Sequence, residues 1–338
     1  MNGISPLSAA TALDPYPYYA RLVREHPFYY DGDLQMWIAS SAQAVEAVLL
    51  HEDFRVRPLS EPVPAQIAGT ACGDLFGRFM RMTDGSYHAQ LKHAALRAFG
   101  AFASNGVADW AKACAVAFGQ RTLAAYMFRF PAFAMARALG LDEKRAISAA
   151  GAARDFSASF SQESTRVLLE EIGFARGPLF EAFGEAAADL DREAIVANAA
   201  AFLIQSCEAT AGLIGNALRA LAADPQQKIE TLVDCVARYD SPVQNTRRFA
   251  AGDVTLFDRI VRAGETVLVL VAAANRDPRS QRSYTFGVGK HACPGERVAC
   301  ALAAAALDVV LQRVDPAALR FIGYRASPNV RIPQFEPA

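Results

Sequence analysis

The most constraining stretch of this sequence is the run of ten residues from Phe286 to Gly295, which reads FGVGKHACPG. The glycines at positions 287 and 289 allow the backbone to approach the cysteine closely and to donate N–H groups to its sulfur. Its one cysteine, Cys293, lies just before an alanine-rich segment, residues 296–313, that we predict to be helical. The positive end of a helix dipole and nearby backbone N–H groups favour a thiolate over a thiol. The stretch therefore predicts a soft cysteine thiolate that can ligate a metal and keep its charge.

These ten residues fill every fixed position of the pattern F-G-x-G-x-H-x-C-x-G, so the stretch resembles the cysteine-ligand loop of the cytochrome P450 family. The resemblance implies that Cys293 is the axial ligand to the iron of haem b, and that His291 contacts a haem propionate. It also assigns Phe286, Gly287 and Gly295 to cofactor binding. A thiolate ligand pushes electron density onto iron and favours O–O cleavage. The alternative is a buried structural cysteine in a glycine-rich turn.

The composition is that of a folded protein without a marked charge. The chain has 338 residues, 52% of them hydrophobic, and a net charge of −1. We expect one domain over residues 1–338, with a small β-containing part over about residues 1–60 and a helical haem-binding remainder. The charge gives no support for nucleic-acid binding. No apolar run approaches the ~20 residues of a membrane span, and the first residues do not read as a signal peptide. We therefore expect a cytoplasmic protein without a membrane anchor.

The cysteines and histidines outside this stretch carry no metal motif. The six cysteines include no C-x-x-C pair, and the five histidines include no H-E-x-x-H. We expect the cysteines to be reduced, as in most cytoplasmic chains.

A second candidate site lies on a predicted helix over residues 86–99. His88 and Lys92 stand four positions apart, on one face of that helix, where they could bind a carboxylate pair. The segment resembles the H-x-x-x-R helix of the family, and the resemblance implies that both side chains hold a haem propionate. Lys92 supplies charge, but not the bidentate fork of the usual arginine. The alternative is a solvated helix face.

The predicted long helix over residues 190–222 resembles the family's helix across the oxygen-binding face of haem, with its pattern A-G-x-[DE]-T. Glu208 fills the acidic position, Ala209 stands at the threonine position, and Thr210 follows one residue later, about 100° around the helix. An acid and an alcohol commonly relay protons in such sites. We predict Glu208 and Thr210 as catalytic residues. Ser206, water or the substrate could supply the hydroxyl instead, and Glu208 could be an ordinary helix carboxylate.

The predicted helix over residues 226–239 resembles the family's E-x-x-R helix, but Cys235 replaces the glutamate that would pair with Arg238. The family's third partner, an arginine in a later loop, would fall in a segment that is cut down here to residues 279–285. Removing one partner of a buried charge pair costs about 3–5 kcal/mol, so losing the whole set is milder. We expect Arg238 to find another acceptor, such as a backbone carbonyl.

The predicted β portion is small. We expect strands at residues 28–30 and 36–38 around a turn, and a hairpin at residues 253–256 and 259–261. Arg248 lies shortly before the hairpin, and the resemblance implies that it meets a haem propionate. The alternative is a surface arginine.

These observations predict a mainly α fold with a small β portion, the cytochrome P450 fold. The resemblance implies a monomeric haem-thiolate monooxygenase that takes electrons from a ferredoxin-type donor and oxidises a small, mostly apolar organic substrate in a biosynthetic pathway. We expect pocket walls from residues 61–77, residues 162–177, the long helix and residues 243–246. The changes at Ala209 and Cys235 keep two alternatives open. One is a peroxide-using or non-oxygenating haem-thiolate enzyme, and the other is a non-catalytic haem or recruitment protein.

Overall fold

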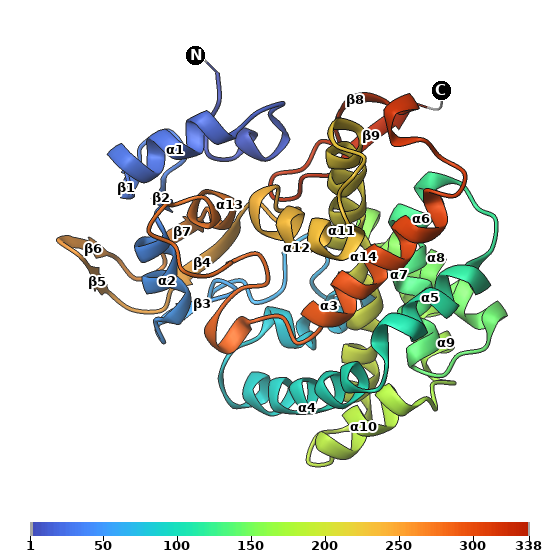
Figure 1. Ribbon diagram of the computed structural model, residues 1–338. Helices are drawn as coiled ribbons and strands as arrows, with labels where there is room; N and C mark the ends of the chain where they lie inside the picture. The colour runs from blue at the N-terminus through green and yellow to red at the C-terminus, as the bar shows by residue number, and fades with distance from the viewer. Residues whose placement is uncertain (1–2, 337–338) are drawn as a thin grey trace. The chain divides into compact units, whose positions relative to one another are not determined.

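The computed structural model of the chain describes residues 3–336, which form two compact units. The first unit comprises Met1–Glu61, Gly215–Cys293 and Pro316–Ala338, and the second comprises Pro62–Ile214 and Pro294–Asp315. The 32-residue helix α11 (Arg192–Ala223) begins in the second unit and ends in the first (Figure 1). That the chain acts as one domain stays a prediction.

A five-stranded sheet forms the centre of the first unit, with its strands in the order β1-β2-β7-β4-β3. Strands β2 and β7 pair in parallel, and the other neighbours pair antiparallel. The strands are β1 (Phe28–Asp31), β2 (Met36–Ala39), β3 (Phe54–Arg55), β4 (Thr246–Ala250) and β7 (Thr266–Val269). The β portion is therefore not confined to the first 60 residues, because segments about 200 residues apart complete one sheet.

Strand β7 is buried on both faces, which explains its continuous apolar sequence. Val267 and Val269 pack into one cluster together with Val45 of α2 (Ala42–Leu50). Leu268 alternates with them and packs into a second cluster on α1 (Tyr16–Glu25). The sheet is thus covered by helices on both sides. Ser41 caps the start of α2, since its side chain accepts a hydrogen bond from the Ala44 N–H at 3.2 Å.

The remaining elements of the first unit are short. The predicted hairpin is confirmed as β5 (Val254–Leu256) and β6 (Arg259–Val261), which project together in Figure 1. Strands β8 (Arg320–Tyr324) and β9 (Pro333–Glu336) pair near the end of the chain. Also in this unit are α12 (Ile229–Tyr239), α13 (Val271–Asn275) and the 3₁₀ turns η1 (Ser8–Thr11), η3 (Gly289–His291) and η4 (Pro316–Ala318).

The second unit is helical. Alanine-rich faces let its helices approach closely, as where α4 packs against α10 and α14 packs against α5 (Figure 1). Its elements are α3 (Ala71–Gly77), η2 (Met80–Met82), α4 (Gly85–Ser104), α5 (Val107–Phe118), α6 (Leu123–Phe128), α7 (Phe130–Ala138), α8 (Glu143–Ser159), α9 (Gln162–Ile172), α10 (Pro178–Ala186), α14 (Glu296–Val310) and the first part of α11.

One helix is more apolar than the sequence analysis expected of any segment. Among the described residues, α11 is long and apolar enough to cross a membrane by length and composition. Polar residues such as Asn198, Gln205 and Glu208 interrupt its apolar sequence, so it contains no long continuous apolar run. Since 61% of its most apolar window is buried inside the protein, the helix also fits the core of a folded protein, and its hydropathy is weak evidence for a membrane.

Candidate functional site

The backbone of the cysteine loop folds back on itself and fixes the position of Cys293. The Cys293 N–H donates to the Phe286 carbonyl at 2.7 Å, and the Gly287 N–H donates to the Tyr284 carbonyl at 2.9 Å. Gly287 and Gly289 adopt φ angles of +69° and +66°, in the left-handed region that favours glycine. The left-handed backbone at both positions explains why glycines stand there.

Gly287 is required for a second reason. A Cβ atom at this position would lie 3.1 Å from the carbonyl oxygen of His291, closer than most Cβ contacts. Cys293 itself is exposed, and the 15-residue helix α14 begins three residues later with Gly295 as its N-cap. The N-terminal end of that helix favours negative charge nearby. The loop therefore presents a sulfur whose backbone is held and whose side chain can be reached, and the alternative of a buried structural cysteine is wrong.

Three of the other cysteines lie in different surroundings, whereas Cys235 is exposed and Cys300 is half-buried. Cys72, Cys114 and Cys207 are buried. Burial raises the pKa of Cys207 to about 12, with a further contribution from the charge of Glu208, and burial raises the pKa of Cys114 to about 11. Both therefore stay protonated thiols at neutral pH, unsuited to metal ligation or nucleophilic chemistry.

Arg248 is an interior residue of β4, with only 7% of its surface exposed, so the surface alternative is wrong. Its Nη1 atom donates to the Arg247 carbonyl at 2.8 Å and lies 3.3 Å from the Thr246 hydroxyl. His291 is half-buried at the end of η3. Both residues belong to the unit that carries Cys293.

His88 and Lys92 lie on α4 of the second unit, only 4% and 8% exposed, which excludes the solvated helix face. The His88 Nδ1 atom lies 2.9 Å from the Met80 carbonyl. Because a carbonyl only accepts, Nδ1 carries a proton, and Nε2 is the atom that would face an anion. A buried ammonium such as that of Lys92 requires a polar or anionic partner. The pair thus has the chemistry of an anion site.

Glu208 and Thr210 lie in an uninterrupted stretch of α11. Glu208 is half-buried and Thr210 is 3% exposed. Two residues correspond to about 200° around an α-helix, so these side chains do not face one another. Ser206 donates its hydroxyl to the Leu203 carbonyl at 2.7 Å, which engages that hydroxyl within the helix. The structure thus does not bring the two predicted catalytic residues together on one face.

The region around Arg238 confirms the expectation of a replacement acceptor. Its Nη2 atom donates to the carbonyl of Ser280 at 3.2 Å, and Cys235, in place of the family's glutamate, is exposed. The Nε atom of Arg238 is buried without a hydrogen-bond partner. The charged triad of the family pattern is thus replaced by one hydrogen bond to the backbone of the shortened loop.

Sequence reasoning missed the residues that hold the start of the cysteine loop. Asn275, Thr285 and Ser241 are all buried and hydrogen-bond to one another or to the backbone on either side of the loop. The available signal was weak: Asn275 ends an apolar run, and Thr285 immediately precedes Phe286. Neither position belongs to the pattern that identified the loop.

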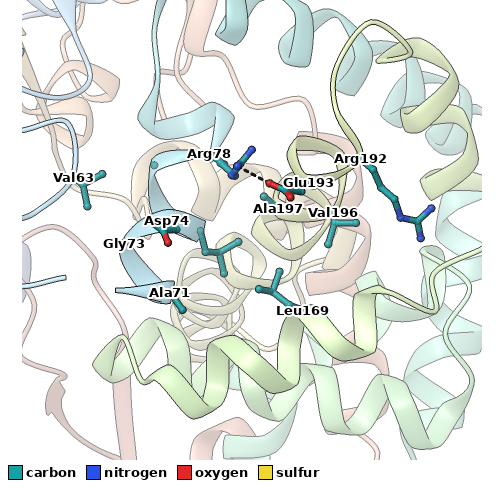
Figure 2. Close-up of a pocket in the computed structure, with 12 residues that line it drawn as sticks. Val63, Ala71, Gly73, Asp74, Arg78, Leu169, Arg192, Glu193, Val196 and Ala197 are labelled. Atoms are coloured by element: carbon teal, nitrogen blue, oxygen red, sulfur yellow. Dashed lines mark hydrogen bonds and ion pairs between the residues drawn. The ribbon is translucent and has the colours of Figure 1, made fainter. Parts of the chain in front are cut away.

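A pocket of about 860 Å³ lies within the second unit, between α3, α9 and the first turns of α11 (Figure 2). Arg78 forms an ion pair with Glu193 at 2.6 Å, drawn in Figure 2, and lies 3.5 Å from Asp191. The apolar part of the wall comes from Val63, Ala71, Leu75, Leu169, Val196 and Ala197. These residues belong to three of the segments predicted to wall the substrate pocket. Eleven residues separate Ala197 from Glu208, about 16 Å along the helix axis, so this pocket does not adjoin Glu208.

Comparison with known proteins gives partial sequence matches. No family model matches the chain. The chain is 34% identical over 148 residues to a putative cytochrome P450 133B2 from Xylella fastidiosa, an alignment that covers 37% of each chain. It is 33% identical over 143 residues to the biotin biosynthesis cytochrome P450 of Bacillus subtilis, covering 36% of each. It is 38% identical over 133 residues to the vitamin D(3) 25-hydroxylase of Pseudonocardia autotrophica, covering 32% of this chain and 33% of that protein. The chain thus spans little more than a third of the length of these curated relatives.

Comparison with solved structures covers nearly the whole chain. The crystal structure of CalO2 matches with a TM-score of 0.78 and 22% identity, over 99% of this chain and 97% of that chain. P450BioI in complex with hexadec-9Z-enoic acid ligated acyl carrier protein matches with a TM-score of 0.75 and 22% identity, over 95% and 97%. The fold is therefore that of the cytochromes P450, and the predicted fold class, mainly α with a small β portion, is confirmed.

Proposed function

Because this chain has the cytochrome P450 fold and is related in sequence to bacterial cytochromes P450, we propose that it is a haem-thiolate oxidoreductase, most simply an O₂-dependent monooxygenase. The observation that carries the proposal is Cys293. It is exposed, its backbone is tied to Phe286, and it lies just before the N-terminus of α14. These are the properties that a thiolate ligand requires.

The donor chemistry of the residues fits haem b. Cys293 would ligate the iron. Arg248 and His291, which belong to the same unit as Cys293, would contact a haem propionate. The resemblance assigns the same cofactor to Phe286, Gly287, Gly295, His88 and Lys92. When bound, a thiolate-ligated haem supplies the oxidising chemistry that protein side chains lack. The protein's part is to hold the thiolate deprotonated and to neutralise the propionates.

Glu208 is proposed to hold and release a proton at its carboxyl oxygens. A half-buried carboxyl group on α11 can exchange protons with solvent and pass them inward. The hydroxyl of Thr210 is proposed as a second group of this helix that takes part in proton transfer. Because the two side chains point in different directions, a water molecule or the substrate would have to complete a relay between them.

A small, mostly apolar organic molecule is the proposed substrate, and a ferredoxin-type protein is the proposed electron donor. The pocket between α3, α9 and α11 supports a mostly apolar substrate, since half of its lining residues are aliphatic and charged residues such as Arg78 and Glu193 line the rest of the wall together with glycines. Because this pocket lies about 16 Å along α11 from Glu208, it would serve as the entrance for the substrate and not as the place of reaction. One structural neighbour was solved with an acyl carrier protein, so a free acid and a carrier-bound acyl chain are the first substrates to compare. A cytoplasmic monomer remains the proposed state.

A peroxide-using enzyme is the second candidate. The observation in its favour is Ala209, which removes the hydroxyl next to the acidic position. Hydrogen peroxide brings its own protons and electrons, so it needs less from α11. Product formation with hydrogen peroxide alone, compared with O₂, ferredoxin and reductase, separates the two candidates.

The proposal is tested by Cys293→Ser, with Cys235→Ser as the matched control at another exposed cysteine. Wild-type protein and Cys235→Ser should bind haem and show the red-shifted ferrous–CO band of thiolate ligation. Cys293→Ser should lose that band completely and keep its far-ultraviolet circular dichroism. An unchanged band in Cys293→Ser would refute the ligand assignment. Wild-type protein that takes up no haem would refute the enzyme and favour a recruitment protein.

A further inference from the structure

The start of the cysteine loop is held by a buried network of neutral side chains. Asn275, Thr285 and Ser241 are 1%, 9% and 1% exposed. Asn275 ends α13, Ser241 follows α12, and Thr285 stands directly before Phe286. All three belong to the first unit, and none belongs to the sequence pattern of the loop.

Asn275 fixes two consecutive residues at once. Its Oδ1 accepts the Tyr284 N–H at 2.6 Å, and its Nδ2 donates to the Thr285 hydroxyl oxygen at 2.8 Å. The backbone and the side chain of the dipeptide are therefore both held by one rigid amide group.

The Thr285 hydroxyl bridges a helix carbonyl and the Asn275 amide. It donates its proton to the Ala237 carbonyl at 2.5 Å and accepts from Asn275. Its oxygen also lies 2.9 Å from the Ser241 hydroxyl, whose single proton goes to the Val243 carbonyl at 2.7 Å. Ala237 lies in the last turn of α12, where carbonyls lack partners within the helix. Thr285 thus joins the end of α12 to the beginning of the loop.

The connection continues to the sulfur through the backbone. Tyr284, which Asn275 holds, accepts the Gly287 N–H, and Phe286, which follows Thr285, accepts the Cys293 N–H. Three hydrogen bonds therefore connect the Asn275 amide, the backbone of the loop and Cys293.

We propose that Thr285 is a positioning residue for Cys293, and that the neutral network of Asn275, Thr285 and Ser241 anchors the start of the cysteine loop. A network of neutral groups avoids the desolvation cost that buried charges carry. The inference rests on the proposed function, because Cys293 must be held in position only if it ligates the haem iron.

The test compares Thr285→Val, which removes the hydroxyl and keeps the shape, with Thr285→Ser, which keeps the hydroxyl. Thr165→Val is the control, because Thr165 is a fully buried threonine of the second unit whose hydroxyl donates to the Ser161 carbonyl at 3.0 Å. Cys235→Ser and Cys300→Ser in every variant leave Cys293 as the thiol open to labelling, since the remaining cysteines are buried.

Two readouts are recorded: the fraction of haem-loaded protein with the thiolate-type ferrous–CO band, and the rate at which the haem-free protein reacts with a thiol reagent. Thr285→Val should convert much of the protein to the form without the thiolate band and should change the labelling rate about tenfold, the size expected from one lost buried hydrogen bond. Thr285→Ser should behave as the parent, and Thr165→Val should change neither readout.

Equal behaviour of Thr285→Val and Thr165→Val in both readouts would overturn the positioning role. If Thr285→Val fails to fold, Asn275→Asp replaces it, because the carboxylate still accepts from Tyr284 but cannot donate to Thr285. The labelling rate is measured without haem, so it tests the anchoring of the cysteine loop independently of the proposed function. A parent protein without a thiolate band would instead count against the proposed function.

Discussion

The cysteine loop and the middle of α11 differ in what determines their geometry. In the loop, left-handed glycines and backbone hydrogen bonds place Cys293, and every position of the family pattern is kept. In α11, a regular helix presents side chains, and the positions around Glu208 depart from the family pattern. A site made by backbone geometry tolerates few substitutions, because each one changes the fold of the loop. A site made by side chains on a helix can change its chemistry while the helix remains.

The comparison leads to an expectation about catalysis. If the altered α11 still serves proton transfer, Glu208→Gln should lower kcat for O₂-dependent turnover about 100-fold, the usual contribution of a positioned acid or base. Thr210→Val should cost less, since its side chain lies about 200° away around the helix. The measurement is steady-state turnover with ferredoxin and reductase. Full activity of Glu208→Gln would make Glu208 an ordinary helix carboxylate.

The backbone character of the loop is tested by Gly287→Ala. An alanine there must adopt a left-handed conformation and place Cβ 3.1 Å from the His291 carbonyl, so we expect the free energy of unfolding to fall by about 2 kcal/mol and the thiolate band to weaken. Gly264→Ala is the control, with φ of +85° and no atom within 4 Å of the added Cβ. It should cost about 1 kcal/mol and leave the band intact. Chemical denaturation and the ferrous–CO spectrum measure both effects, and a normal band in Gly287→Ala would contradict the account.

The smallest expected effect concerns Asp277, a buried residue that precedes the cysteine loop in the sequence. Its buried carboxylate accepts from the Ala42 N–H at 3.0 Å and from the Arg279 side chain at 3.1 Å. Burial alone would raise the pKa of Asp277, but the hydrogen bonds from Arg279 and Ala42 outweigh burial and lower it. A lowered pKa in the folded state contributes stability that is present above the unfolded pKa of about 3.9 and is lost as the pH falls through the folded pKa.

Asp277→Asn should therefore reduce the free energy of unfolding by about 1 kcal/mol at neutral pH. The difference from wild type should shrink below about pH 4. Urea denaturation over a pH series measures it, and Asp234→Asn, at an exposed position of α12, should follow the wild-type profile. A constant difference at every pH would mean that Asp277 acts through its shape and not its charge.

Helix starts, hairpins and the cysteine loop were predictable because local rules specify them. Ser41 caps α2 within its own turn, and the loop pattern lies within ten residues. The structural environments of His88 and Lys92 were less predictable, since spacing placed them on one face but could not show that the face is buried. The hydrogen bond of Arg238 was predicted as a type of contact, and only the structure identified Ser280 as the acceptor.

The sequence alone determined the local backbone of the cysteine loop, since its glycines and Cys293 form hydrogen bonds within residues 284–293. Only the tertiary structure revealed how that loop is held. Asn275, Thr285 and Ser241 come from three segments, and Ala237 from a fourth position in the last turn of α12. Neutral hydrogen bonds across such separations leave no periodicity and no charge pattern in a sequence. They arise only when packing excludes water and each buried polar group must find its partner inside the fold.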